Sequence, residues 1–160
     1  MKVELIDKMG TDLSVVNAAR VSYAKEKEEF EKSDERLIRY LAEHKHWSPF
    51  AHTFLSFRIK APVFVARQLV KHQVGLVWNE ESRRYITYDP EIYNIRKWRK
   101  KPDSSKQGSG EQILISTELN LEVSEHLQQG LKLYNRLLLE NVAPEQARAV
   151  LPQSMYTNWI

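Results

Sequence analysis

One long amphipathic pattern constrains the fold of this chain more than any other feature of its sequence. Between residues 116 and 140 the apolar side chains recur at helical spacing and form a single stripe: Leu119, Val123, Leu127, Leu131, Tyr134 and Leu138. A helix with one apolar stripe buries that stripe against other elements. A chain of 160 residues is long enough to supply the core for it within one domain.

The other patterns alternate between strand and helix. Period-two alternation predicts strands at residues 3–7 and 52–60, the second half-buried through Thr53, Leu55, Phe57 and Ile59. Helix-start signals are Thr11, for a helix through Ala19, and Ser33, for a helix with Leu37, Tyr40, Leu41 and His44 on one face. Pro62 and Pro144 suit first helical positions, for helices over residues 63–73 and 144–152. Together these patterns predict an α+β fold.

Several segments are expected to lack regular structure or to be short. The charged stretch 25–32 is a solvated turn or a helix extension, and Gly75 marks a break. Residues 82–88 form a short strand or an extended segment. The Pro, Gly and Ser content of residues 100–111 predicts a flexible loop. The apolar end at Trp159-Ile160 suggests that the chain stops within a helix or just before one.

Composition excludes several classes of function. The chain has no cysteine, which rules out disulfides, cysteine metal sites and thiolate nucleophiles, and we expect no bound metal. No apolar run is long enough to cross a bilayer, so no membrane partner is expected. The first residues place acids inside their short apolar stretch, unlike a secretory signal. The sequence therefore predicts a cytoplasmic protein.

The net charge of +3 and the pI of about 9.0 leave three interpretations open. The chain is an ordinary soluble protein, a nucleic-acid binder, or a protein with a site for phosphorylated small molecules. Basic residues gather at Arg83-Arg84 and over residues 96–101, where Trp98 could stack on a base. The small number of cations and the lack of a recognised nucleic-acid motif count against a nucleic-acid-binding module.

Residues 66–85 hold the densest group of polar side chains that could bind a ligand. On the predicted helix, Phe64, Gln68 and His72 share one face, and Arg67 and Lys71 share a neighbouring one. Arginine offers a planar fork to phosphate oxygens, and Asn, Gln and Glu can read an amide-like ring. The alternative is a solvated helix end followed by a polar turn, with His72 as a hydrogen-bonded structural residue.

The same segment resembles the signature of the flavin-dependent thymidylate synthases. The run Asn79-Glu80-Glu81-Ser82-Arg83-Arg84-Tyr85 matches the family pattern Asn-Glu-x-Ser-x-Arg-Tyr in full. Lys71-His72-Gln73 stands where the family has Arg-His-Arg, and the spacer to Ser82 is eight residues instead of seven. Compared with the arginines of the family pattern, Lys71 keeps the positive charge but lacks the forked pair of N–H donors, and Gln73 lacks the charge.

Four flanking segments resemble the family in the right order. They are residues 12–23, the His-rich stretch 44–52, residues 60–68 and the Ala-Arg-x-x-Leu-Pro element at 147–152. The matches cover most of the chain outside residues 98–111. On this resemblance the chain is identified as a member of the family, whose fold packs helices on a small, mostly antiparallel sheet.

The resemblance implies an activity and a set of ligands. Family members are homotetramers with active sites shared between subunits, and they bind FAD. They convert dUMP to dTMP, with methylenetetrahydrofolate as carbon donor and NADPH as reductant. By position, the FAD site comprises Ser22, His46, Ser48, Lys71, His72, Gln73 and Glu80. The dUMP site comprises Gln68, Glu80, Ser82, Arg83, Arg84 and Arg148.

As catalytic residues we take Ser82 and Arg84. Ser82 is interpreted as a contact to the ligand instead of a nucleophile, because the sequence supplies no clear base for it. The absence of cysteine fits this family, since the other kind of thymidylate synthase attacks the pyrimidine with a thiolate. A reduced flavin activates the ring by hydride transfer and leaves the protein to bind and orient.

The resemblance also implies that the family continues beyond Ile160. A later segment of family members adds flavin contacts and an arginine that engages the pyrimidine. We therefore expect a single domain over residues 1–160 that is incomplete at its C-terminus, with weak or absent turnover by this chain alone and binding less affected. A non-catalytic structural remnant of the family is the remaining alternative.

Overall fold

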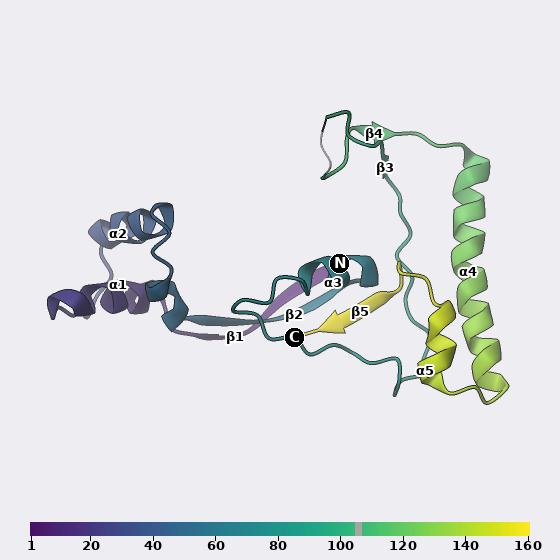
Figure 1. Ribbon diagram of the computed structural model, residues 1–160, viewed down its shortest axis with the longest axis horizontal. Helices are drawn as coiled ribbons and strands as arrows, with labels where there is room; N and C mark the ends of the chain where they lie inside the picture. Colours follow the sequence, from purple (N-terminus) through teal and green to yellow (C-terminus); the bar gives the residue numbers. More distant parts are fainter. Residues whose placement is uncertain (105–106) are drawn as a thin grey trace. The chain divides into compact units, whose positions relative to one another are not determined.

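The computed structural model describes residues 1–104 and 107–160, which form two compact units. Residues 3–58 make up the N-terminal unit, and residues 1–2 together with 59–160 make up the C-terminal unit. The element order is drawn in Figure 1. Each unit is described below by itself.

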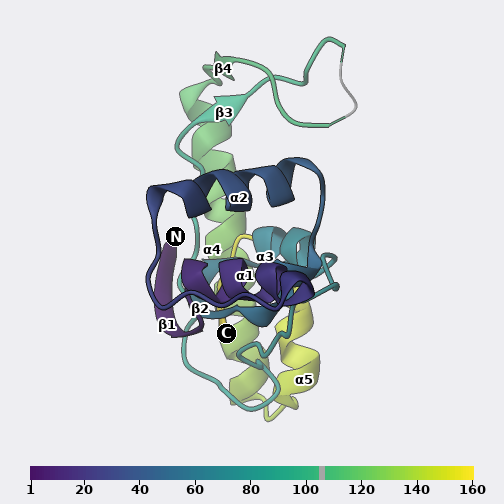
Figure 2. The same ribbon diagram turned by 90° about the vertical axis from the view of Figure 1, so that its left-hand side faces the viewer.

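The N-terminal unit contains most of β1 (Lys2–Met9), then α1 (Asp12–Arg20), α2 (Lys32–Glu43) and the start of β2 (Phe54–Pro62). Short 3₁₀ turns lie at Val21–Tyr23 and Ser48–His52. α1 begins where the sequence predicts, because the Thr11 amide donates to the Ser14 hydroxyl oxygen at 3.0 Å and closes a capping box. α1 and α2 pack against each other (Figure 2), with Val16 and Leu41 in the buried part.

α2 begins at Lys32, with Glu31 as its N-cap, so the predicted start at Ser33 is wrong in detail. The reason is Asp34, which is completely buried and accepts a hydrogen bond from the Glu31 amide at 3.0 Å. Its carboxylate also pairs with Lys27 at 2.7 Å and Arg20 at 3.0 Å. The Lys27 hydrogen bond, the Glu31 amide and the Arg20 hydrogen bond lower the pKa of Asp34 to about 2.

The strand predicted at residues 52–60 is present as β2, but its expected half-buried face is largely exposed. Leu55 is 61% exposed and Phe57 37% exposed. On α2 the predicted apolar face also reaches solvent, since Tyr40 is exposed and stacks on His44 with ring centroids 4.0 Å apart. These apolar faces have no cover within the described residues of the unit.

The C-terminal unit holds the end of β2 and all later elements. They are α3 (Val63–Leu69), β3 (Trp98–Arg99), β4 (Gln112–Ile113), α4 (Thr117–Leu139), α5 (Pro144–Ala147), a 3₁₀ turn at Arg148–Val150 and β5 (Tyr156–Trp159). The larger sheet has the order β1-β2-β5, and β5 pairs antiparallel with β2 from Ile59↔Trp159 to Pro62↔Tyr156. Helices packed on a small antiparallel sheet confirm the predicted α+β class.

The core of this unit lies where β2, α3 and β5 meet. Ala61, Ala66 and Trp159 are buried there, and Trp78 stacks on Trp159 with ring centroids 4.5 Å apart. The N-terminus of α3 is satisfied close to this core, because the Val63 amide donates to the Met155 carbonyl at 2.9 Å. The backbone of α3 is thereby fixed to the segment that leads into β5.

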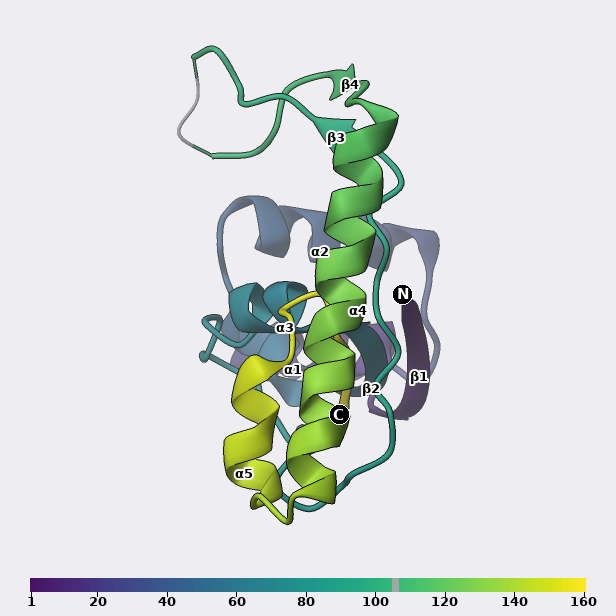
Figure 3. The same ribbon diagram turned by 90° about the vertical axis from the view of Figure 1, so that its right-hand side faces the viewer.

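The long predicted helix is confirmed as α4, and the Ser116 hydroxyl oxygen caps it by accepting the Leu119 amide at 3.1 Å. Its stripe is buried only in part: Tyr134 is inaccessible, whereas Leu119 is 45% exposed. α4 lies beside α5 (Figure 3), and it approaches the following 3₁₀ turn at Gly130. A Cβ added at Gly130 would lie 3.1 Å from the Val150 carbonyl oxygen.

Three sequence predictions in this unit need correction. α3 ends at Leu69 instead of Gln73, because the His72 amide turns back to the Leu69 carbonyl at 3.0 Å. Residues 82–88 form no strand; the Tyr85 amide donates to the Ser82 carbonyl at 3.1 Å in a turn. The last residues form β5, so the chain does not stop within a helix, and the alternative that it stops just before one stays a prediction.

The predicted loop at residues 100–111 connects β3 and β4, which pair as a short antiparallel hairpin. Its base is closed by the Lys100 amide, which donates to the Glu111 carbonyl at 3.0 Å. Part of the predicted loop, residues 105–106, lies outside the described residues. Among the helices that the structure describes, none combines the length and the apolarity needed to span a membrane.

Candidate functional site

A cleft of about 630 Å³ lies within the C-terminal unit. Three segments form its walls: α3, the signature run at residues 80–83, and residues 148–157 between α5 and β5. The side chains with ionisable or hydrogen-bonding groups on these walls are Arg67, Glu80, Glu81, Ser82, Arg83, Arg148, Gln153 and Thr157.

Glu80 is held in a fixed orientation at the cleft. The Thr157 hydroxyl donates to Glu80 Oε1 at 2.7 Å, and the Trp78 indole N–H donates to Oε2 at 3.3 Å. The backbone of Glu80 also bridges to Trp159 of β5. Since Thr157 is buried, this carboxylate depends on β5 for its position.

The Arg83 side chain is buried within the unit and paired there. It is 6% exposed, pairs with Glu81 at 3.4 Å and donates to the Tyr88 carbonyl. Its guanidinium also lies 4.7 Å from the centroid of the Tyr88 ring. The Glu81 carboxylate is also paired, because the side-chain amide of Asn158 donates to its Oε2 at 2.6 Å. These contacts neutralise one cation and one anion on the cleft wall.

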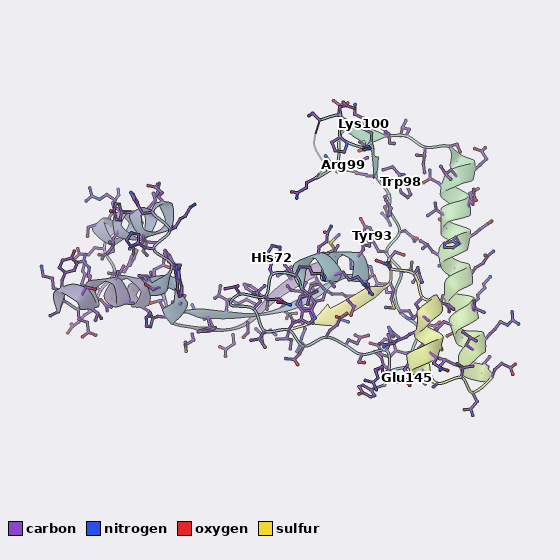
Figure 4. All side chains as sticks on the ribbon, viewed as in Figure 1. His72, Tyr93, Trp98, Arg99, Lys100 and Glu145 are labelled. Atoms are coloured by element: carbon purple, nitrogen blue, oxygen red, sulfur yellow. The ribbon has the colours of Figure 1, made fainter. Side chains whose placement is uncertain are left out.

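Four of the residues expected to bind dUMP come together at this cleft: Glu80, Ser82, Arg83 and Arg148. Arg84 does not line it. Its side chain pairs instead with Glu145 of α5, labelled in Figure 4, with Nε and Oε2 3.4 Å apart. Gln68 is exposed on α3 and does not line the cleft either.

Lys71, His72 and Gln73 lie together in an exposed turn after α3. Because α3 ends at Leu69, the predicted shared face of Phe64 and His72 on one helix does not exist. Figure 4 shows His72 beside α3. The turn presents an ammonium, an imidazole and an amide to solvent, all of which can donate to phosphate or carbonyl oxygens.

The remaining expected flavin residues belong to the N-terminal unit. Ser22 lies in the 3₁₀ turn after α1, and Ser48 begins the turn before β2; both are exposed. His46 follows α2, where its amide donates to the Leu41 carbonyl at 2.8 Å, and its exposed ring lies edge-on to His44 at 6.5 Å.

Arg67 and Thr157 line the cleft, although neither was expected to belong to a site. A signal existed for Arg67, which immediately precedes Gln68 in the segment that resembles the family. None existed for Thr157, because its place beside Glu80 comes from a strand pairing between distant parts of the chain.

Known proteins resemble the chain over most of its length. The family described as "Thymidylate synthase complementing protein" matches residues 4–160. A flavin-dependent thymidylate synthase of Kosmotoga olearia is 43% identical over 159 residues, covering 97% of this chain and 67% of the relative. One from Thermus thermophilus is 41% identical, covering 98% of this chain and 57% of the relative.

A solved structure shows the same fold. A UMP/dUMP methylase, PolB from Streptomyces cacaoi bound with 5-Br dUMP, is 37% identical with a TM-score of 0.78. The match covers 99% of this chain and 70% of that one. The chain therefore belongs to the thymidylate synthase complementing protein family, and its matched relatives include flavin-dependent thymidylate synthases.

Proposed function

We propose that this chain binds dUMP in the cleft of the C-terminal unit and contributes, with FAD, to the methylation of dUMP to dTMP. Methylenetetrahydrofolate is the proposed carbon donor and NADPH the proposed reductant. The observation that carries the proposal is the convergence of Glu80, Ser82 and Arg148 on one cleft, from segments almost 70 residues apart in the chain.

The chemistry of the cleft suits a pyrimidine nucleotide. A guanidinium offers a forked pair of N–H donors to phosphate oxygens. Among the described residues, the Arg148 side chain makes one internal hydrogen bond, from its Nε to the Glu145 carbonyl at 3.2 Å. The Glu80 carboxylate is an acceptor that Thr157 holds in place, which suits the N–H of a uracil ring. Ser82 adds a hydroxyl that can donate or accept.

The donors proposed for FAD also fit their ligand. Lys71, His72 and Gln73 are exposed, so their polar groups are free to meet the phosphates and the carbonyl oxygens of a dinucleotide. FAD, when bound, supplies redox chemistry in place of the thiolate attack that a chain without cysteine cannot perform. The protein's part is to bind and orient both ligands.

A homotetramer with shared active sites is part of the same proposal. The expected flavin residues are divided between the two units, with Ser22, His46 and Ser48 in the N-terminal one. That unit also exposes large apolar side chains, which suits burial against another copy: Val3, Leu5, Phe54 and Leu55 are each more than half exposed. Sedimentation of the purified chain measures the assembly directly.

The first experiment is an absorbance spectrum of the purified chain with and without FAD and dUMP. A bound-flavin spectrum that shifts when dUMP is added is the expected result, because both ligands are proposed to meet at Glu80. Absence of flavin and of dUMP binding under all conditions would instead favour a structural remnant of the family.

Salt-sensitive binding to generic DNA would favour the nucleic-acid-binding alternative. The hairpin that would have to provide that surface is partly neutralised. Lys100 lies 3.6 Å from Asp103 and 3.8 Å from Glu111, and Arg99 donates to the Gly110 carbonyl. The Trp98 indole is held by Asn120 at 2.9 Å, so its ring is already placed against α4 (Figure 4).

A further inference from the structure

The ionisable side chains of the cleft differ in how fully they are paired within the protein. Five ionisable side chains line it: Arg67, Glu80, Glu81, Arg83 and Arg148. Arg83 and Glu81 neutralise each other, and both carboxylate oxygens of Glu80 already accept a hydrogen bond. Arg67 and Arg148 therefore carry the positive charge that remains for a ligand.

Arg67 has fewer internal partners than Arg148. It projects from the last turn of α3, is exposed, and forms no ion pair or side-chain hydrogen bond with any residue that the structure describes. Arg148 donates its Nε to the Glu145 carbonyl, and its terminal nitrogens have no partner among the residues that the structure describes. The two guanidiniums belong to different walls of one cleft, α3 and the 3₁₀ turn after α5.

The start of α3 does not offer backbone amides as an anion site. The first amides of α3 are occupied, since Val63 donates to the Met155 carbonyl at 2.9 Å and Phe64 to the Gln153 carbonyl at 3.1 Å. A phosphate at this wall of the cleft therefore cannot use the first two amides of α3, which leaves the side chain of Arg67 as a donor. Of the cations on α3 and the turn after it, Arg67 lines the cleft and Lys71 does not.

We propose that Arg67 is a second phosphate ligand, which closes on the nucleotide 5′-phosphate from the wall opposite to Arg148. The proposal rests on the proposed function, because it assigns a residue to the same nucleotide site. A phosphate monoester carries close to two negative charges at neutral pH, since its second pKa is about 6. Two forked cations match that charge better than one.

The test compares Arg67→Gln, Arg67→Lys and the control Arg136→Gln by calorimetric titration with dUMP and with deoxyuridine. Arg136 is an exposed arginine in the last turn of α4, outside the cleft, so its substitution removes the same charge from the same unit. Arg67→Gln is expected to weaken dUMP binding by about 10- to 100-fold, as for loss of a charged hydrogen-bonding partner. Deoxyuridine binding should stay within about twofold, because it has no phosphate.

Two further readouts separate ligation from a general loss of charge. Arg67→Lys should recover part of the affinity, because it keeps the charge and loses the fork. The gain in dUMP affinity between about pH 5 and 7, where the phosphate loses its second proton, should be smaller in Arg67→Gln than in the wild type. Arg136→Gln should match the wild type in both.

The outcomes distinguish this proposal from the proposed function. If the wild type binds dUMP and Arg67→Gln binds it as tightly as Arg136→Gln does, Arg67 is no ligand and the proposed function stands. If the wild type binds deoxyribose 5-phosphate as well as dUMP, and Arg67→Gln loses both, Arg67 holds phosphate and the uracil assignment fails. Equal weakening of dUMP and deoxyuridine in Arg67→Gln would also overturn the phosphate role.

Discussion

Replacing Tyr134 by alanine should destabilise the C-terminal unit more than any conservative change on α4. The side chain is completely buried, and its hydroxyl donates to the Ile86 carbonyl at 3.4 Å. A buried tyrosine ring removes roughly 150–250 Å² from water, which at about 25 cal/mol per Å² corresponds to roughly 4–6 kcal/mol as an upper bound. Truncation of a buried aromatic typically costs about 3–5 kcal/mol.

Tyr134→Phe separates the ring from the hydroxyl. The bond to Ile86 is long for an O–H···O hydrogen bond, whose usual distance is about 2.7–2.8 Å, so its loss should cost only about 0.5–1 kcal/mol. Neighbouring Asn135, which donates to Asp89 at 2.8 Å, continues to hold the same loop against α4. Packing should therefore account for most of the effect of Tyr134→Ala.

The assay is urea unfolding followed by tryptophan fluorescence in a Trp47→Phe background. Trp47 lies in the N-terminal unit and the other three tryptophans in the C-terminal unit, so this background reports the C-terminal unit alone. Equal destabilisation by Tyr134→Phe and Tyr134→Ala would refute the packing argument and make the hydroxyl the main contributor. A loss below about 1 kcal/mol for Tyr134→Ala would show that the site relaxes around the cavity.

Two other substitutions test separate parts of the fold. Gly130→Ala should destabilise the C-terminal unit by about 1 kcal/mol, because the new methyl group meets the Val150 carbonyl, and this outweighs the higher helix propensity of alanine. The exposed control Gln129→Ala should change the melting temperature little. The pKa of Asp34 is lowered to about 2, so its ionised form stabilises the N-terminal unit above about pH 4, and that contribution is lost as the pH falls through 2. Asp34→Asn should therefore flatten the acid limb of the stability profile measured by circular dichroism, and an unchanged limb would contradict the role of the pair with Lys27.

Helices whose start or apolar face depends on neighbouring residues could be predicted from the sequence. Thr11 was the expected start of α1 and caps it, and the apolar stripe predicted α4, which Ser116 caps. The start of α2 differs by one residue because the decisive group, the buried Asp34, reaches back to Lys27 and Arg20. A tertiary ion pair of this kind leaves no periodic trace in the sequence.

The end of α3 could not be predicted for a similar reason. Residues 70–73 contain neither Gly nor Pro, so the helical pattern continues up to the Gly75 break. The structure turns earlier, and this moves Lys71 and His72 from the predicted helix faces into an exposed turn. The signature was found by resemblance, but its arrangement in space depends on where the helix stops.

The candidate site was predicted in its residue types but not in its framework, because β5 was not expected. β5 pairs with residues 59–62, nearly 100 positions earlier in the chain, and such pairings cannot be read from a local pattern. Arg83 and Arg84 are neighbours in the sequence, and yet their surroundings differ. Arg83 is buried against Tyr88, whereas Arg84 is half exposed beside Glu145.

The framework also shows why the signature run and the C-terminal strand act as one structure. Asn79 and Ile160 exchange both backbone hydrogen bonds at 3.0 Å, and the Glu81 amide donates to the Asn158 carbonyl at 2.9 Å. The run is thereby added to the edge of β5, and Thr157 reaches Glu80 from within that pairing. Because β5 fixes Glu80 and the segment before it fixes α3 with Arg67, a change in the pairing of β5 alters both walls of the cleft together. The geometry of the cleft therefore depends on the sheet. A residue of β5 that does not contact the proposed nucleotide can still set the affinity of the cleft for it.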